Sequence, residues 1–186
     1  MKEQLLIAVK MMLVFTVITG IIYPLATTGF AQVLFHSQAN GSLVRAHGHM
    51  AGSRLIGQAW TGPRYFHGRP SANGYNGLAS GGSNFGPTNR AYIEKIRQRA
   101  AAWQKRTGSR QPIPADLVEA SFSGLDPDIS PGAALYQAPR VARARHLSLA
   151  TVQALIRRYT HGRTLGMIGS PAVNVLQLNL ALDRLH

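Results

Sequence analysis

The sequence predicts an α+β protein with one N-terminal transmembrane helix followed by a mixed domain that carries a long, ordered, Gly-rich loop. Three observations support this. Met11–Phe35 is 25 residues long and contains no charged residue, whereas a helix needs about 20 mostly apolar residues to cross a bilayer. Helix caps and a short strand-like pattern recur after this segment. Tyr65–Asn89 is rich in Gly, Ser and Asn, with aromatic residues spaced through it.

The apolar segment divides the chain into three predicted parts. Residues 1–10 form a cytoplasmic head, residues 11–35 the transmembrane helix, and residues 36–186 a domain on the outer side. Lys2 and Lys10 lie in the head, and basic residues beside a first span favour the cytoplasmic side. Gly20 permits close helix approach and Pro24 kinks a helix. Both features therefore indicate a helix that packs against protein partners.

A cleavable signal peptide is the alternative interpretation of the same segment. Lys10, the apolar core Met11–Tyr23 and the small residues Gly29 and Ala31 fit that pattern. Val33–Phe35 continue the apolar run and count against cleavage. With cleavage, the chain would be a secreted basic binding protein.

Charge is the main compositional feature. The chain has 20 Lys and Arg against 7 Asp and Glu, a formal charge of +13, and no Cys. The domain after the span has 18 basic and 6 acidic residues, which leaves +12. Such a domain is attracted to polyanions or anionic headgroups, or simply has a well-solvated surface. No nucleic-acid-binding motif accompanies the charge, so no nucleic acid partner is expected.

Local patterns predict the remaining elements. Arg54–Gly57 is a short apolar patch that indicates a strand. Thr88 or Asn89 caps a helix that runs to about Lys105, with a short helix later at Ala115–Ala120. Three further caps start later helices: Ser130 before Pro131, Ser148, and Asn174. Leu149, Val152, Leu155, Ile156 and Tyr159 are expected to face inward on the second of these.

Catalytic and metal-binding patterns are weak. Asp126 and Asp128 flank a proline, which is typical of a turn. His47 and His49 lack a third ligand nearby, so no metal site is predicted. Ser80–Ser83 is Gly-rich but lacks the Lys-Ser/Thr ending of a phosphate-binding loop. No nucleophile elbow is present either. We therefore predict no catalytic residue and no independent enzyme activity.

Several motifs together resemble one known family. The chain is similar to KdpC, the C subunit of the bacterial potassium-transporting ATPase Kdp. The similarity covers nearly the whole domain and the end of the span, YPLATTGFAQVLF. The matching stretches are SRLIGQ (53–58), YFHGRPSANGYN (65–76), SGGSNFGPTN (80–89), SGLDPDISPGAALYQAPRVARAR (123–145) and VNVLQLNLAL (173–182).

The resemblance implies a function. It implies an accessory, non-catalytic subunit of an ATP-driven potassium import complex in the bacterial inner membrane, with one transmembrane helix and a periplasmic domain. The implied partners are a channel-like potassium subunit, a P-type ATPase subunit, a small fourth subunit and membrane lipid. The family is described as a catalytic chaperone that raises the ATP affinity of the ATPase subunit. No cofactor is expected to bind tightly, and ATP would be reached through the complex.

Candidate site residues follow partly from the resemblance and partly from the residues themselves. The resemblance implies that Gln137 contacts nucleotide. The polar loop is expected to contact a partner subunit near the potassium entrance, and Gly20 and Pro24 to serve helix packing. The candidate loop residues are Arg69, Ser71, Asn76, Ser80, Gly81, Gly82, Ser83 and Asn84.

Overall fold

A computed structural model describes residues 1–185 of the chain. The chain forms two compact units, Met1–Leu43 and the remainder from Val44 onward. The first unit is helical, and the second contains helices and antiparallel strands. The predicted α+β class with one apolar N-terminal helix is therefore confirmed.

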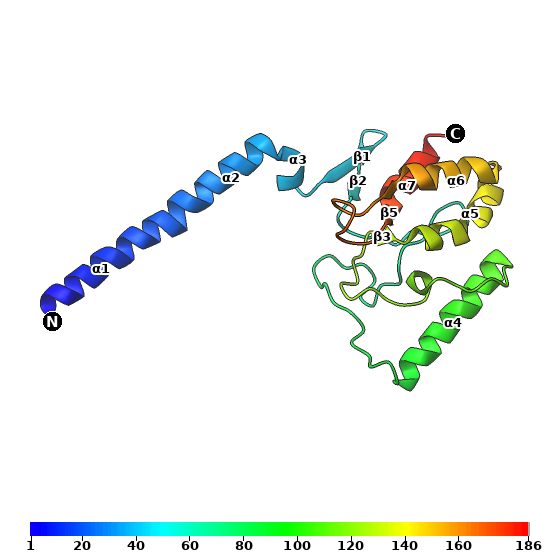
Figure 1. Cartoon of the computed structure of the whole chain (residues 1–186), viewed down its shortest axis with the longest axis horizontal. Coiled ribbons are helices and arrows are strands. Elements are labelled where there is room, and N and C mark those ends of the chain that lie inside the picture. Colours follow the sequence, from blue (N-terminus) through cyan, green and yellow to red (C-terminus); the bar gives the residue numbers. More distant parts are fainter. Residues whose placement is uncertain (186) are drawn as a thin grey trace. The chain divides into compact units, whose positions relative to one another are not determined.

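The first unit consists mainly of one long helix, drawn in blue in Figure 1. It comprises α1 (Lys2–Val17), a π-helical turn η1 (Ile18–Ile22) and α2 (Tyr23–Leu34). Together they make a 33-residue helix that is long and apolar enough to cross a membrane. None of its residues is buried within the chain. Its apolar side chains therefore need lipid or protein around them.

The π-helical turn lies directly before Pro24. Proline has no N–H to donate and its ring crowds the carbonyl one turn earlier, which here belongs to Gly20. A wider turn at Ile18–Ile22 accommodates that loss, and the helix then continues to Leu34. The hydroxyl of Thr19 donates to the Phe15 carbonyl at 2.7 Å, so this polar group is paired within the apolar segment.

The second unit begins with a hairpin. A short helix, α3 (His36–Ala39), precedes β1 (Leu43–Ala46) and β2 (His49–Ser53), which pair in a two-stranded sheet. The strand predicted at Arg54–Gly57 is wrong: these residues form a turn after β2. The apolar pattern was misleading because Leu55 and Ile56 are 57% and 42% exposed. Gly57 instead donates its N–H to the Leu125 carbonyl at 2.7 Å.

The helix after the long loop confirms its prediction. α4 (Arg90–Thr107) is capped by the side chain of Asn89 and ends at Gly108, which has a left-handed φ of 66°. Trp103 is its buried residue, and the indole N–H donates to the Leu117 carbonyl at 2.9 Å. The short helix that follows, η2 (Ala115–Leu117), is a 3₁₀ turn and stops before the predicted end at Ala120.

The remaining elements form the core. They are β3 (Asp128–Ile129), α5 (Pro131–Arg145), α6 (Leu149–Arg158), β4 (Thr160–His161), β5 (Ala172–Asn174) and α7 (Val175–Asp183). The three strands pair antiparallel in the order β3-β5-β4. Ser130, Ser148 and Asn174 each accept a backbone N–H at the start of their helices, which confirms the predicted caps.

Helix α5 is the centre of the second unit. It runs without interruption through Pro139, and it lies between α4 and α6 (Figure 1). Its small residues Ala133 and Ala138 are fully buried, which lets neighbouring elements approach closely. On α6, Val152 and Ile156 face this core as predicted, but Leu149 is 42% exposed because it lies in the first turn of the helix.

Candidate functional site

Two side-chain amides hold consecutive residues of the segment that links β2 to α4, Phe66 and His67. Oδ1 of Asn179 accepts the Phe66 N–H at 2.8 Å, and its Nδ2 donates to the Phe66 carbonyl at 2.9 Å. Gln137 makes the same pair of bonds to His67, at 2.9 and 3.0 Å. Both amide side chains are completely buried. Each replaces the hydrogen bonds that a neighbouring strand would otherwise provide.

Arg140 fixes the residues just before this clamp. Its guanidinium donates to the carbonyl oxygens of Gly62 (3.2 Å), Pro63 (2.8 Å) and Tyr65 (2.8 Å). It also donates to Oε1 of Gln137 at 3.0 Å. Gln137 and Arg140 are three residues apart on α5, so they lie on the same face of the helix. The result is a tight loop folded around a buried cation.

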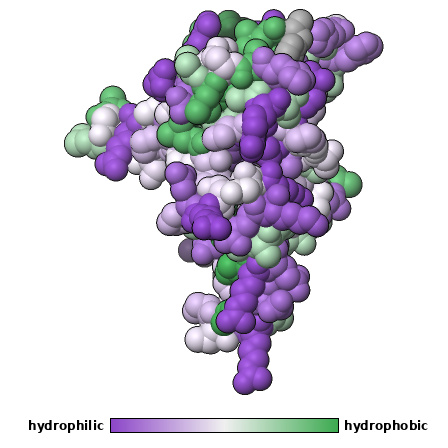
Figure 2. Space-filling view, turned by 90° about the vertical axis from the view of Figure 1, so that its right-hand side faces the viewer, coloured by the Kyte–Doolittle hydropathy of each residue, from purple (hydrophilic) through white to green (hydrophobic). Residues whose placement is uncertain are grey.

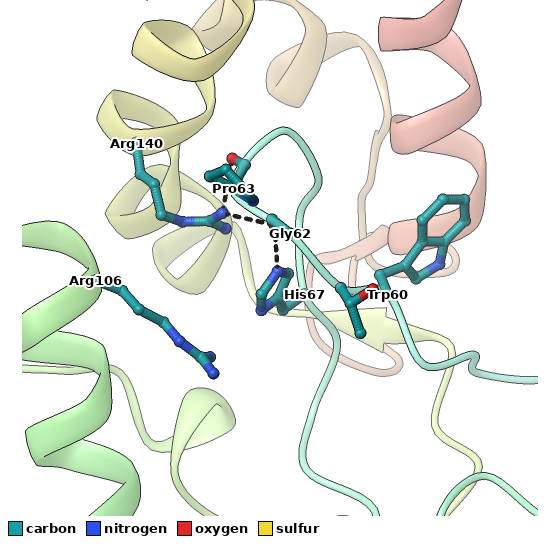
Figure 3. A pocket seen from close by; sticks show the side chains of 7 residues that line it. Trp60, Gly62, Pro63, His67, Arg106 and Arg140 are labelled. Atoms are coloured by element: carbon teal, nitrogen blue, oxygen red, sulfur yellow. Dashed lines mark hydrogen bonds between the residues drawn. The ribbon is translucent and has the colours of Figure 1, made fainter.

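A cavity of about 490 Å³ opens beside this loop (Figure 3). Arg140 reaches it from α5 and Arg106 from α4, while the other lining residues come from the segment between β2 and α4. The lining residues are Trp60, Thr61, Gly62, Pro63, His67, Arg106 and Arg140. None of them is acidic.

The cavity is strongly cationic. Burial, and secondly the nearby charge of Arg106, lowers the pKa of Arg140 to about 10, so its guanidinium is still protonated at neutral pH. The two guanidinium carbons lie 5.6 Å (Arg140) and 5.5 Å (Arg106) from the ring centre of Trp103. Those distances are typical of cation–π contacts. The indole therefore contributes to holding two like charges near each other.

His67 is neutral in this environment. Its Nε2 lies 2.8 Å from the Gly62 carbonyl and donates to it in the neutral form. The pKa of His67 is lowered to about 4, chiefly by burial; the bond to Gly62 opposes this shift, and the charges of Arg140 and Arg106 act in the same direction as burial. The positive charge of the cavity at neutral pH thus comes from the two arginines.

Acid is expected to destabilise the domain through His67. Because the pKa falls from 6.5 in the unfolded chain to about 4 in the folded one, the unfolded state binds the proton first as pH drops. The contribution of His67 to the free energy of unfolding is therefore fully present above about pH 6.5. It falls by about 2 kcal/mol toward pH 4, after allowance for partial exposure. Urea unfolding of the detergent-solubilised chain at pH 7, 5 and 4 measures this decline.

The matched variants are His67→Gln and His49→Gln, the latter at an exposed position of β2. The His67 variant should lose less stability across this pH interval than the wild type, whereas the His49 variant should follow the wild type. A decline of equal size in all three proteins would contradict the assignment.

Some predicted contact residues are committed to the fold. Arg69 forms an ion pair with Asp126 at 3.2 Å. Asn76 accepts the Leu78 N–H at 3.0 Å within a local turn. Asn84 has a left-handed φ of 53°. Arg69 and Asn76 thus bond within the fold, and none of the three residues lines the cavities described here.

The Gly-rich stretch packs tightly against a second segment. Gly81 donates its N–H to the Ser123 carbonyl at 2.8 Å, and the Ser80 hydroxyl donates to the same oxygen at 3.0 Å. A Cβ on Gly82 would lie 2.8 Å from the Phe122 carbonyl oxygen, so only glycine fits there. The main chain of this stretch therefore packs against Phe122 and Ser123 of the same chain.

Three of the predicted contact residues do share a cavity. Ser71, Gly82 and Ser83 line a space of about 360 Å³ together with Lys95 and Arg99 of α4. Phe85, Tyr92 and Ala72 complete its walls. Gly20 and Pro24 lie in the apolar helix of the other unit.

The arginine cavity was hard to predict from the sequence. Lys95, Arg99 and Arg106 are spaced to lie on one face of a helix, a signal that could have been used. Arg140 and Asn179 carry no local signal, because their partners are more than 70 residues away in the chain. Within residues 1–185, no three His, Asp or Glu side chains are placed to share a metal ion. The absence of a metal site stays a prediction.

Comparison with known proteins gives the family. A family model described as "KdpC: K+-transporting ATPase, c chain" matches residues 5–184. A protein named "Potassium-transporting ATPase KdpC subunit" from Methylococcus capsulatus is 56% identical over 183 residues, covering 96% of each chain. The protein of that name from Acidobacterium capsulatum is 54% identical over 96% of this chain and 97% of its own length.

A more distant relative covers the whole length. The KdpC subunit of Mycobacterium bovis is 51% identical over 189 residues, which is 100% of both chains. None of these similarities supports the alternative of a secreted basic binding protein. The matches span the apolar helix and the domain with its two amide clamps, and so the chain belongs to the KdpC family of subunits of the potassium-transporting ATPase.

Proposed function

We propose that this chain is a non-catalytic accessory subunit that stabilises an ATP-driven, high-affinity potassium import complex. The observation that carries the proposal is the helix Lys2–Leu34, which is apolar, 33 residues long and unburied within its own chain. Such a helix needs lipid or neighbouring helices around it. Gly20 and the π-helical turn before Pro24 supply the irregular face that closely packed helices use.

The proposed arrangement places the amino terminus in the cytoplasm and the domain in the periplasm. The partners are the channel-like potassium subunit, the P-type ATPase subunit and the small fourth subunit. The segment that carries Arg69, Ser71, Asn76 and the stretch Ser80–Asn84 faces the channel-like subunit near the potassium entrance. Its hydrogen bonds to the residues around Ser123 support a fixed contact surface.

The effect on ATP affinity is proposed to be indirect. A subunit raises the affinity of another when it binds one conformation of that partner more tightly than the other. Gln137 is completely buried and its amide makes three hydrogen bonds, to the main chain of His67 and to Arg140. This geometry supports a structural role for Gln137, and its contact with nucleotide stays a prediction.

The test is assembly in cells. A variant whose residues 1–35 are replaced by a cleavable signal peptide should fail to copurify with the other subunits, and growth at low potassium should be lost. A second variant keeps a membrane anchor but replaces Met11–Phe35 with a plain leucine–alanine helix of equal length. It separates anchoring from helix packing, and it should assemble poorly because it lacks Gly20 and Pro24.

Full assembly of either variant would overturn the proposed role of the helix. Because the chain has no Cys, a single Cys in place of the exposed Arg110 gives a unique label. Reaction with a membrane-impermeant maleimide in intact cells then verifies that every variant exposes the domain on the same side.

A further inference from the structure

The arginine cavity continues as a groove along one side of α4. A space of about 250 Å³ shares Trp60, His67 and Arg106 with the 490 Å³ cavity. The same space shares Arg99 with the 360 Å³ cavity beside the Gly-rich stretch. These three adjoining spaces are called the α4 groove here. The hollow is therefore elongated and follows the helix.

A row of basic residues lines the α4 groove. Lys95, Arg99 and Arg106 are four and seven residues apart, which puts them within about 40° of one another around the helix. Along the helix axis they span about 16 Å. Arg140 adds a fourth positive charge from α5 at one end. The fixed charges thus form a line.

Among residues 1–185, no carboxylate forms an ion pair with this line. The residues that line the α4 groove include no Asp or Glu. Within residues 1–185 the ion pairs are Arg69–Asp126 and Arg145–Asp183, and neither involves the groove. Arg140 is 6% exposed, and its Nε is buried without a hydrogen-bond partner among the described residues. A buried cation that pairs only with neutral oxygens is costly, and an anion beside it offsets that cost.

The walls of the α4 groove are partly aromatic. Figure 2 shows one face of the molecule, on which hydrophilic residues predominate. In the α4 groove the charges lie beside the aromatic rings of Trp103 and Phe85, and Trp60 lines the same groove. The Lys95 ammonium lies 4.9 Å from the ring centre of Phe85. Apolar walls lower the local dielectric constant, which strengthens the attraction of the fixed cations for an anion.

From this geometry we infer that the α4 groove binds an acidic segment of a partner polypeptide in an extended conformation. An extended chain rises about 3.3 Å per residue, so about five residues fill 16 Å. Carboxylates two residues apart on such a chain are about 6.6 Å apart. The rise between Lys95 and Arg99 is about 6 Å. A single small anion would leave most of the line unpaired.

The inference rests on the assembly role proposed above only for the source of the segment, a partner subunit. Binding itself is therefore tested on the isolated, full-length chain in detergent, where failure of assembly has no influence. The probe is a fluorescein-labelled peptide of eight alternating Glu and Ala residues. The control probe has Gln in place of Glu. Both tryptophans of the chain lie at the groove, so intrinsic fluorescence provides a second readout.

The matched variants are Arg106→Gln and Arg97→Gln. Both residues are exposed on α4, and they are nine residues apart, which places them on opposite faces of the helix. The wild type should bind the acidic peptide saturably, and 0.5 M salt should release it. Arg106→Gln should weaken binding about five- to tenfold, as expected for loss of one charge-assisted contact, whereas Arg97→Gln should change it less than about twofold.

Three results would overturn the inference. One is no binding of the acidic peptide, and another is an equal loss in both variants, which would mean attraction to net charge alone. The third is displacement of the peptide by phosphatidylglycerol vesicles or inorganic polyphosphate with affinities that depend on Arg106 more strongly than peptide binding does. That result would assign the groove to phosphate groups. Unchanged thermal unfolding of Arg106→Gln verifies that the variant is folded.

Discussion

Replacement of Gln137 with Leu is expected to lower the free energy of unfolding by about 3 kcal/mol in the isolated chain. Leu has a similar volume and a good helix propensity, so α5 itself should tolerate it. What is lost is the pair of hydrogen bonds to His67 and an acceptor for the guanidinium of Arg140. The main chain of His67 is then left without partners beside a fully buried apolar side chain.

Asn179→Leu is expected to cost a similar amount, since the Phe66 main chain loses both of its bonds to the amide. The two clamps hold consecutive residues of one segment. Once either is removed, the segment loosens and the second amide has less to hold. The double variant should therefore cost less than the sum of the two single variants, by about 1 kcal/mol.

Urea unfolding of the detergent-solubilised chain, without ATP, measures these values. Gln98→Leu is the matched control, because Gln98 is exposed on α4 and its side chain donates to the exposed Glu94 of the same helix. It should change stability by less than about 0.5 kcal/mol. Equal, small effects of Gln98→Leu and Gln137→Leu would contradict the conclusion that Gln137 stabilises the fold by holding the His67 main chain. A large effect without ATP would mean that activity lost in Gln137 variants does not report nucleotide contact.

The helices were predictable from local sequence because their signals are local. Asn89, Ser130, Ser148 and Asn174 each cap a helix by binding N–H groups two or three residues ahead. No tertiary contact is needed for that signal. The strand at Arg54–Gly57 was mispredicted because four apolar-rich residues do not carry enough of a period to distinguish a strand from a turn.

The groove and the clamps could not be predicted in the same way. They depend on Phe66 meeting Asn179 and on Tyr65 meeting Arg140, pairs separated by 113 and 75 positions in the chain. A sequence pattern does not fix which buried amide reaches which main-chain group. The family resemblance pointed to Gln137, and the structure adds its hydrogen-bond partners.

Arg145→Met is expected to be the most destabilising single substitution at a charged residue, at about 3 to 5 kcal/mol. Arg145 is 2% exposed and lies at the end of α5. Its Nη2 donates to Oδ1 of Asp183 at 2.6 Å and its Nε to the Arg64 carbonyl at 2.7 Å. The guanidinium carbon also lies 5.0 Å from the ring centre of Tyr65. One side chain thus joins α5, α7 and the loop around the arginine cavity.

Asp183→Asn should cost less, about 1 to 2 kcal/mol, because its side chain is 27% exposed and Asn still accepts a hydrogen bond. Met keeps most of the apolar stem of Arg145, so the larger loss reports the guanidinium and not the packing. Arg157→Met, at an exposed position of α6, is the matched control and should change stability by less than about 0.5 kcal/mol.

Salt distinguishes this buried pair from surface charge. The Arg145 side chain is 1% exposed, so 0.5 M NaCl should leave the difference between wild type and Arg145→Met nearly unchanged. Thermal unfolding of the three variants at low and high salt measures it. If the difference disappears at high salt, or if Arg157→Met costs as much, Arg145 acts through general charge and not through the contacts at Asp183 and Arg64. Because those contacts support the loop that Arg140 also holds, Arg145→Met should in addition weaken peptide binding in the α4 groove.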